Sequence, residues 1–269
     1  MLKSHRLEAW VIADELLATV PHDIAVRDVW IGIHWTAVLL ADGRCGMAST
    51  LYSEGHVHGH ADVRDPGALH THSALALAAH ARHGQGVEAS VGWAALNALV
   101  SDSFDRAGCA RADALDFLLK HGAGRRVAVV GHFPFTQRLR EQVGELWVFE
   151  LHPADGEFPA SEAPARLPHA DVVAITSLTL VNGTFAGLIA HCRPETPVML
   201  LGPSTPLSPV LFAHGVDVLA GVRVDDADVL YRTITQGATF QQVRGVQKVT
   251  IARPGSPDYH LSQEEGPHR

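Results

Sequence analysis

The chain of 269 residues has few cysteines, few charged residues and no long apolar run. Its three cysteines, Cys45, Cys109 and Cys192, are odd in number and far apart, which excludes a CxxC motif and a readable disulfide framework. We expect each to be a small buried side chain in a reducing compartment. No apolar stretch reaches the roughly eighteen residues of a membrane span, and the amphipathic N-terminal stretch does not resemble a signal peptide. The sequence therefore predicts a cytoplasmic protein without membrane contact.

Several motifs of known chemistry are also missing. The sequence has no GxSxG nucleophile turn, no GxxxxGK[ST] phosphate loop and no HExxH metal motif. The stretch GHFPF stands where a dinucleotide-binding turn would be, but it contains one glycine, Gly131, so no NAD is expected. The net charge of −8 disfavours binding to nucleic acid, because phosphate groups would be repelled. Catalytic residues stay unknown, and whether the protein is an enzyme is left open.

What is present is ample apolar material, arranged in two patterns. Hydrophobic residues make up 46% of the chain, enough for one large domain or two ordinary ones. Residues 1–110 show a helix to about Thr19, strands with a hairpin at Asp42–Gly43, and helices opening at Ser73 and Glu88. Residues 111–253 alternate apolar strands with helices, which is typical of a mostly parallel sheet. We predict an α+β domain, then an α/β domain, and a disordered tail over 254–269.

The predicted strand ends of the second domain carry the most distinctive polar residues. Ligands of open parallel sheets bind outside the carboxyl ends of the strands. His132 follows the first strand, near a predicted helix start, and could bind a ligand or simply hydrogen-bond a loop carbonyl. Glu150 follows Gly131 by 19 residues, the spacing of a ribose-binding acid, although a solvated strand-end acid is the favoured explanation. The candidate ligand-binding residues at these ends are Gly131, His132, Glu150, Thr176, Thr179, Asn182, Gly202, Ser204 and Thr205.

Residues 55–83 contain seven histidines. In an extended segment His56, His58 and His60 would point to one face, because side chains alternate along a strand. Such a trio, or a set that includes His132, could bind zinc, nickel, copper or cobalt. The competing interpretation is a polar loop that binds metals only adventitiously. The sequence therefore marks His56, His58, His60 and His132 as candidate metal ligands and leaves the identity of the metal open.

Four segments of the second half resemble the DUF364 family, a family associated by name with heavy-metal chelation. These are GHFPF, ELHP, ADVVAITSLTLVNGT and VMLLGPSTPLSPVLFAHGVDVLAG, in that order. Upstream, CGMAST and VEASVGWAALNAL resemble its companion region DUF4213, so the resemblance covers about residues 5–240. It implies an enolase N-terminal-like domain followed by a Rossmann-like domain with a cleft between them. The motif positions are Glu88, Ser90, Gly92, Asn97, Gly131, His132, Pro134, Glu150, Thr176, Thr179, Asn182, Gly183, Gly202, Pro203, Ser204, Thr205 and Pro206.

Three hypotheses follow. The first is a binding protein for a metal ion or metal complex, with His132, Glu150 and Asn182 on one wall of the cleft and Glu88 or Asn97 on the other. The second is a lyase or transferase that acts on a small anionic or chelating metabolite in the same cleft, with an imidazole as acid or base. The third is a homo-oligomeric scaffold assembled through the small-residue helix at residues 88–100, although such helices pack equally well inside one core.

Overall fold

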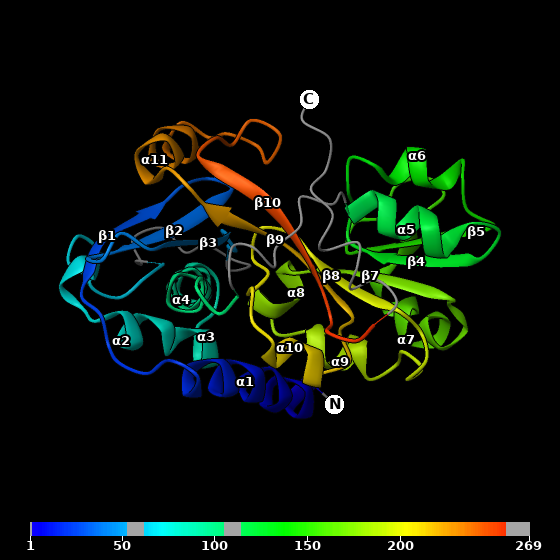
Figure 1. Ribbon diagram of the computed structural model, residues 1–269, viewed down its shortest axis with the longest axis horizontal. Coiled ribbons are helices and arrows are strands. Elements are labelled where there is room, and N and C mark those ends of the chain that lie inside the picture. Colours follow the sequence, from blue (N-terminus) through cyan, green and yellow to red (C-terminus); the bar gives the residue numbers. More distant parts are fainter. Residues whose placement is uncertain (1, 53–61, 105–113, 257–269) are drawn as a thin grey trace.

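The computed structural model describes residues 2–52, 62–104 and 114–256, which fold into two β-sheets with helices around them (Figure 1). The small antiparallel sheet has the order β1-β2-β3 and consists of β1 (Val26–Ile31), β2 (Trp35–Leu40) and β3 (Cys45–Ser49). The large sheet has the order β10-β9-β8-β7-β4-β5-β6. Its strands are β4 (Arg126–Val130), β5 (Glu145–Glu150), β6 (Phe158–Pro159), β7 (Val172–Thr176), β8 (Val198–Leu201), β9 (Val218–Val224) and β10 (Val246–Ala252). All pairings in it are parallel except that of β10 with β9. The predicted combination of a small antiparallel and a mostly parallel sheet is confirmed.

The helices of the first part surround the small sheet. They are α1 (Leu2–Ala18), α2 (Ala74–Ala78), α3 (His80–His83) and α4 (Val87–Leu99). Every residue of α4 except Glu88 is buried. Gly46 of β3 and Gly92 of α4 make this packing possible, because a Cβ at Gly46 would overlap the backbone of α4 and one at Gly92 the backbone of α3. The small-residue face of α4 therefore packs inside a single chain, as core packing predicts.

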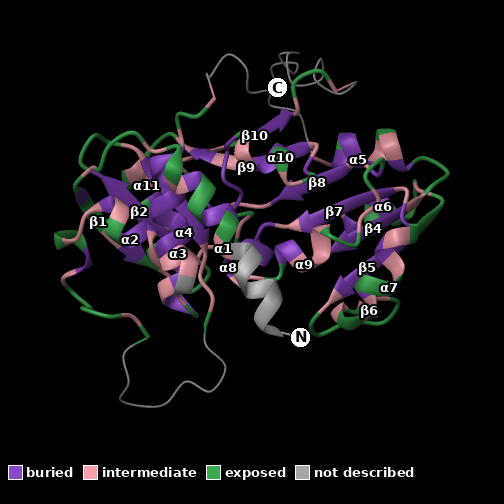
Figure 2. Ribbon diagram, turned by 90° about the horizontal axis from the view of Figure 1, so that it is seen from below, coloured by how far each residue is buried: buried purple, intermediate pink, exposed green. Residues whose placement is uncertain are grey.

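The large sheet is covered on both faces, which explains its continuous apolar strands. One face packs against α5 (Ala114–Gly122) and α6 (Thr136–Arg140). The other face packs against α7 (Ala163–Arg166), α9 (Phe185–Ile189) and α10 (Val210–Ala213), and its core continues into that of α1 and α4 (Figure 1). Two further helices are α8 (Leu178–Val181), which packs near β3, and α11 (Ala227–Thr235), which covers the small sheet. Figure 2 shows the buried residues concentrated in the strands of both sheets and in α4.

The order of the large sheet reverses at β4. The chain runs from β4 outward to β5 and β6, returns to β7 on the other side, and continues to β10. The carboxyl ends of β4 and β7 therefore lie at the switch in strand order, where open α/β sheets bind ligands. Gly131, with φ of 104°, closes the end of β4, and a Cβ there would lie 2.9 Å from Thr176. At the end of β8, Gly202 has φ of 127°, and a Cβ there would lie 2.6 Å from Ser177 Oγ.

Several local predictions are confirmed and others need revision. Gly43 has φ of 92° in the β2–β3 hairpin, and Ser73 Oγ accepts a hydrogen bond from Ala76 N at 3.2 Å as the α2 cap. The single helix predicted for residues 73–83 is divided into α2 and α3. The helix expected near Asn182 is two short ones, α8 and α9, with Asn182 between them. Neither β6 nor β10 was predicted.

The described cysteines are buried or half-buried. Burial raises the pKa of the Cys45 and Cys192 thiols to about 12, so both stay protonated near neutral pH. Cys109 lies outside the described residues, as do residues 257–269 of the predicted tail. Among the helices that the structure describes, none has the length and apolar character needed to cross a membrane.

Candidate functional site

A cavity of about 420 Å³ lies at the carboxyl end of β8, beside the middle of β9 and β10 and the loop that follows β4. Its volume falls within the range of small-molecule sites, about 300–1,000 Å³. Its lining comes from α5, α6 and the loop before it, the end of β8, the middle of β9, the loop after α11, and β10. The lining residues are Ala114, Leu115, Phe133, Pro134, Phe135, Arg138, Leu201, Gly202, Pro203, Ala220, Gly221, Phe240, Gln241, Lys248, Val249 and Thr250.

Aromatic rings form two parts of this wall. Phe133 and Phe135 are stacked, with ring centroids 5.3 Å apart and planes 6° from parallel. Across the lining, the Phe240 ring contacts Trp35, at 5.7 Å between centroids, and lies 5.5 Å from Lys248 Nζ. The cavity therefore combines aromatic surface with an ammonium group that a cation–π contact helps to position.

Positive charge dominates the polar part of the lining. Arg138 and Lys248 are exposed at the rim, and neither side chain forms an ion pair with a described residue. Among the described residues that line the cavity there is no Asp or Glu, although the whole chain carries a net charge of −8. The two cations therefore make the described part of this lining locally favourable for a negative ligand.

His132, the residue before Phe133, faces a different partner. Its side chain is 60% exposed, and its Nδ1 lies 2.8 Å from Oε1 of Glu157, whose side chain is 7% exposed. The other Glu157 oxygen accepts a hydrogen bond from Ala154 N at 2.9 Å. The Ala154 N–H and then the His132 imidazole lower the pKa of Glu157, so its carboxylate form is favoured. Sequence reasoning missed Glu157, because no local motif links residues 25 positions apart.

Asn97 and Ser204 lie in the seam between the two sheets, which we define as β3, α4 and the loop after β8. Asn97 Nδ2 donates to Met47 O at 2.9 Å and to Ser204 O at 3.2 Å. Ser204 Oγ accepts from Ser49 N at 2.8 Å. Both side chains are buried. Their hydrogen bonds therefore tie β3 and α4 to the edge of the large sheet.

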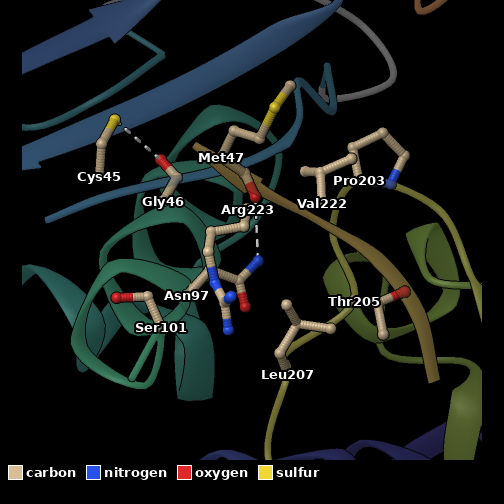
Figure 3. Close-up of a pocket in the computed structure, with 10 residues that line it drawn as sticks. All are labelled: Cys45, Gly46, Met47, Asn97, Ser101, Pro203, Thr205, Leu207, Val222 and Arg223. Atoms are coloured by element: carbon tan, nitrogen blue, oxygen red, sulfur yellow. Dashed lines mark hydrogen bonds between the residues drawn. The ribbon is translucent and has the colours of Figure 1, made fainter. Parts of the chain in front are cut away.

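A second cavity, of about 20 Å³, adjoins this seam (Figure 3). Among the described residues, no hydrogen-bond partner meets Asn97 Oδ1, which is buried at this cavity. A space of this size, beside an amide oxygen and the hydroxyls of Ser101 and Thr205, suits a single water molecule. The seam is thus polar but too small for an organic ligand.

Glu88 is engaged at the start of α4. Its Oε1 accepts from Arg64 N at 3.0 Å and from Arg64 Nε at 2.9 Å, and its Oε2 lies 3.9 Å from His80 Nδ1. Burial alone would raise the pKa of Glu88, but the hydrogen bonds from Arg64 outweigh it and lower that pKa. Burial lowers the pKa of His80, and Glu88 opposes this only in part. The predicted ligand Glu88 therefore belongs to a half-buried ionic network.

At the strand ends that were predicted to bind a ligand, the hydroxyl and amide groups largely form hydrogen bonds with nearby backbone. Thr179 Oγ1 donates to Thr176 O at 2.6 Å, and Thr205 Oγ1 donates to Ala220 O at 3.2 Å. Asn182 Oδ1 accepts from the Thr184 hydroxyl at 2.6 Å and from its N–H at 3.1 Å. Glu150 Oε2 accepts from Leu151 N at 3.1 Å. These groups shape the strand ends, and a ligand would have to compete for them.

The structure separates the predicted residues into several places. Gly202 lines the large cavity, while Asn97 and Thr205 line the small one. A third cavity of about 260 Å³ is lined by His70 and by residues of β1, and none of the three is lined by Glu88, His132, Glu150 or Asn182. Within residues 2–52, 62–104 and 114–256, no three His, Cys, Asp or Glu side chains gather as a metal site. The predicted ligands His56, His58 and His60 lie outside the described residues.

Two family sequence models match the chain. The sequence model of DUF364, described as "Putative heavy-metal chelation", matches residues 113–253, and that of DUF4213, with the same description, matches residues 13–100. The chain belongs to the DUF364 family. The predicted resemblance is confirmed.

Individual relatives agree with this assignment. The crystal structure of a DUF364-family protein of unknown function from Desulfitobacterium hafniense superposes with a TM-score of 0.78 at 27% identity, covering 91% of this chain and 99% of that one. A second, from Pyrococcus horikoshii, has the same TM-score and coverage at 22% identity and shows the shared fold. The uncharacterized protein MJ0500 of Methanocaldococcus jannaschii is 27% identical over 168 residues, 60% of this chain. The chain spans 64% of the length of that relative.

Proposed function

We propose that this protein is a cytoplasmic binding protein for a heavy or transition metal, taken up as a complex with a small chelating molecule. The observation that carries the proposal is the 420 Å³ cavity beside the carboxyl end of β8, with aromatic walls and two rim cations. The heavy-metal description of the family supports the metal. We further take residues 1–110 as an enolase N-terminal-like domain and residues 111–253 as a Rossmann-like domain.

The donor chemistry favours a complex over a bare ion. Transition metals in proteins are usually held by three or four N, S or O side chains. Among the described residues near the edge of the large sheet, the nitrogen and oxygen donors that lie together are His132 and Glu157, at 2.8 Å. A metal that arrives with its own organic ligands needs few or no protein donors. The cavity then recognises the organic part.

The interdomain cleft predicted from the sequence is the competing location. In it, His132, Glu150 and Asn182 would face Glu88 or Asn97, with His56, His58 and His60 delivering the metal. The engagement of Glu88 with Arg64 and of Asn97 with Met47 favours the edge cavity instead. The two locations predict different consequences for substitutions, so one set of variants separates them.

The test is elemental analysis of untagged, gel-filtered protein by inductively coupled plasma mass spectrometry. We expect about one transition metal per chain to copurify. The variant Gln241→Trp, which fills the cavity from an exposed position, should lose the metal. Two controls should keep it: His132→Ala with Asn182→Ala, and a variant with His56, His58 and His60 changed to Ala. Loss in either control but not in Gln241→Trp moves the site to the cleft or the histidine segment. Absence of metal from the wild type, even after incubation with zinc, nickel, copper and cobalt, contradicts the proposal.

A second candidate is a lyase or transferase that acts on a small anionic or chelating metabolite. One observation favours it: the exposed imidazole of His132 is paired with the shielded carboxylate of Glu157 beside the cavity, an arrangement suited to general acid–base chemistry. Turnover in a screen of such metabolites, lost in both His132→Ala and Glu157→Gln, would establish an enzyme. Binding without turnover in the same screen would retain the binding protein.

A further inference from the structure

The lining of the large cavity indicates what type of molecule the cavity would bind. We infer that its ligand is an organic anion with a flat, aromatic body, held between the phenylalanine walls with its negative group at Arg138 and Lys248. This inference rests on the proposed function and specifies the chelating molecule that it requires. It concerns recognition of the organic part alone, so it can be tested without a metal.

The apolar lining favours a flat body. Phe133 and Phe135 present a stacked pair from the loop between β4 and α6, and Phe240 approaches from the loop after α11. The floor between them consists of short or aliphatic residues of β8, β9 and β10, among them Leu201, Ala220 and Val249. A conjugated ring system can lie against both aromatic walls, and each ring contact is worth about 0.5–1.5 kcal/mol beyond the area that it buries.

The charges at the cavity rim indicate that the ligand carries a negative charge. Arg138 and Lys248 stand at the rim without an ion pair to any described residue, and no acid is among the described residues of the lining. Several other arginines are matched with carboxylates, such as Arg44 with Asp42 and Arg126 with Asp171. Two unmatched cations around an apolar cavity complement a carboxylate, sulfonate or phenolate. Gln241, also in the lining, can donate to such a group or accept from a hydroxyl.

The arrangement also orients the ligand. The Lys248 ammonium lies 5.5 Å from the Phe240 ring, so it is held beside an aromatic wall rather than free in solvent. Arg138 lies on α6, one turn from Phe135, and therefore on the opposite aromatic wall. A ligand with its anionic group at the rim would insert its ring between the two walls.

The experiment uses 8-hydroxyquinoline-5-sulfonate, a flat aromatic anion that chelates divalent metals, in calorimetric titrations of the full chain. Four probes are compared: the free sulfonate, its nickel complex, neutral 8-hydroxyquinoline, and nickel alone. We expect one sulfonate per chain, about tenfold weaker binding of the neutral parent, and weakening by salt. Arg138→Gln and Lys248→Gln should each weaken sulfonate binding about threefold, the effect of losing one exposed charge pair. Phe135→Leu should weaken the sulfonate and the neutral parent alike.

Two matched controls keep the result specific. Arg27→Gln removes one positive charge from an exposed position on β1, a strand of the small sheet with no residue in the described lining, and should leave binding unchanged. Lys248→Arg keeps the charge and should retain most of the affinity. If Arg27→Gln weakens binding as much as Lys248→Gln does, only net charge matters, and the inference is overturned. Equal binding of the sulfonate and the neutral parent overturns it as well.

The probes also separate this inference from the proposed function. Tight, charge-dependent binding of the free sulfonate together with rejection of its nickel complex would keep the anion site and contradict metal handling. Copurifying metal that persists in the Arg138→Gln/Lys248→Gln double variant, with no sulfonate binding to wild type, would keep metal handling and overturn the anion site. Binding of the sulfonate and of its nickel complex, both reduced by the same substitutions, would support both.

Discussion

The seam between the two sheets and the edge cavity share the start of the loop after β8, where Pro203 lines both the large and the small cavity, but their polar groups are placed differently. In the seam, Asn97 and Ser204 are buried and bonded to backbone of the other part. At the edge, Arg138 and Lys248 are exposed and unmatched among the described residues. The motifs that resemble the family contain Asn97 and Ser204, whereas neither rim cation belongs to such a motif. Polar residues of a family-like motif can therefore join two parts of the fold, and the ligand contacts that we propose lie outside those motifs.

The largest expected effect on stability comes from crowding the seam. A Cβ at Gly46 would overlap the backbone of Ala94 and Ala98 in α4. We expect Gly46→Val to destabilise the fold by at least about 3 kcal/mol, because backbone cannot move aside as a side chain can. Urea unfolding followed by circular dichroism measures this. Ala41→Val, an exposed substitution in the turn after β2, is the control and should change stability by less than about 0.5 kcal/mol.

Removing the amide of the seam should have the next largest effect. Asn97→Ala leaves Met47 O and Ser204 O without their shared donor, at a cost of about 2–3 kcal/mol. The same denaturation curves measure this loss. Affinity for the sulfonate probe should stay unchanged under conditions where the variant is folded. A variant of unaltered stability that no longer binds ligand would instead place the binding site at the seam.

Glu157, near the edge of the large sheet, makes a pH-dependent contribution to stability. The pKa of Glu157 is lower in the folded protein than its ordinary value of 4.5. Its stabilising contribution is therefore fully present above pH 4.5 and is lost as the pH falls through the folded pKa. Wild type should exceed Glu157→Gln in stability at pH 6, and the difference should shrink between pH 4.5 and 3. Unfolding curves at several pH values check this, and a difference that grows on acidification would contradict the direction of the shift.

The smallest expected effect on stability comes from removing the rim cations. Arg138→Gln and Lys248→Gln should each change the free energy of unfolding by less than about 0.5 kcal/mol, because neither forms an ion pair with a described residue. Thermal unfolding of both variants and of Arg27→Gln measures this. A marked loss of stability in either rim variant would show that the cation supports the fold, and would weaken the case for a ligand there.

Much of the fold was predictable because its signals are local. The apolar runs that became β4, β7 and β8 are buried on both faces, and such runs are distinctive in sequence. The hairpin at Asp42–Gly43 and the cap at Ser73 depend on side chains within three residues. By contrast, β6 has two residues and β10 mixes exposed Lys248 with buried Val249, so neither shows a clear strand pattern.

The site was less predictable because it is assembled from distant segments. Gly202 was marked by its place at a strand end, and it does line the cavity. Phe133 and Phe240 share a cavity although more than 100 residues separate them, and no spacing rule connects them. Glu157 meets His132 only because β6 pairs beside β5. For Glu88, Glu150 and Asn182 the structure gives local partners, and their role as ligands stays a prediction.

The antiparallel strand β10 has a consequence for the order of events during synthesis. Lys248 pairs opposite Val222 of β9, and with Val249 and Thr250 it supplies one side of the cavity. The rest of the lining is translated earlier, so a nascent chain that has not yet released residues 246–252 has an open groove in place of a cavity. Docking of this late strand both closes the sheet and adds the lysine. A ribosome-bound chain should therefore acquire affinity for an anionic ligand only after residues 246–252 have left the ribosome and the core of the large sheet has formed.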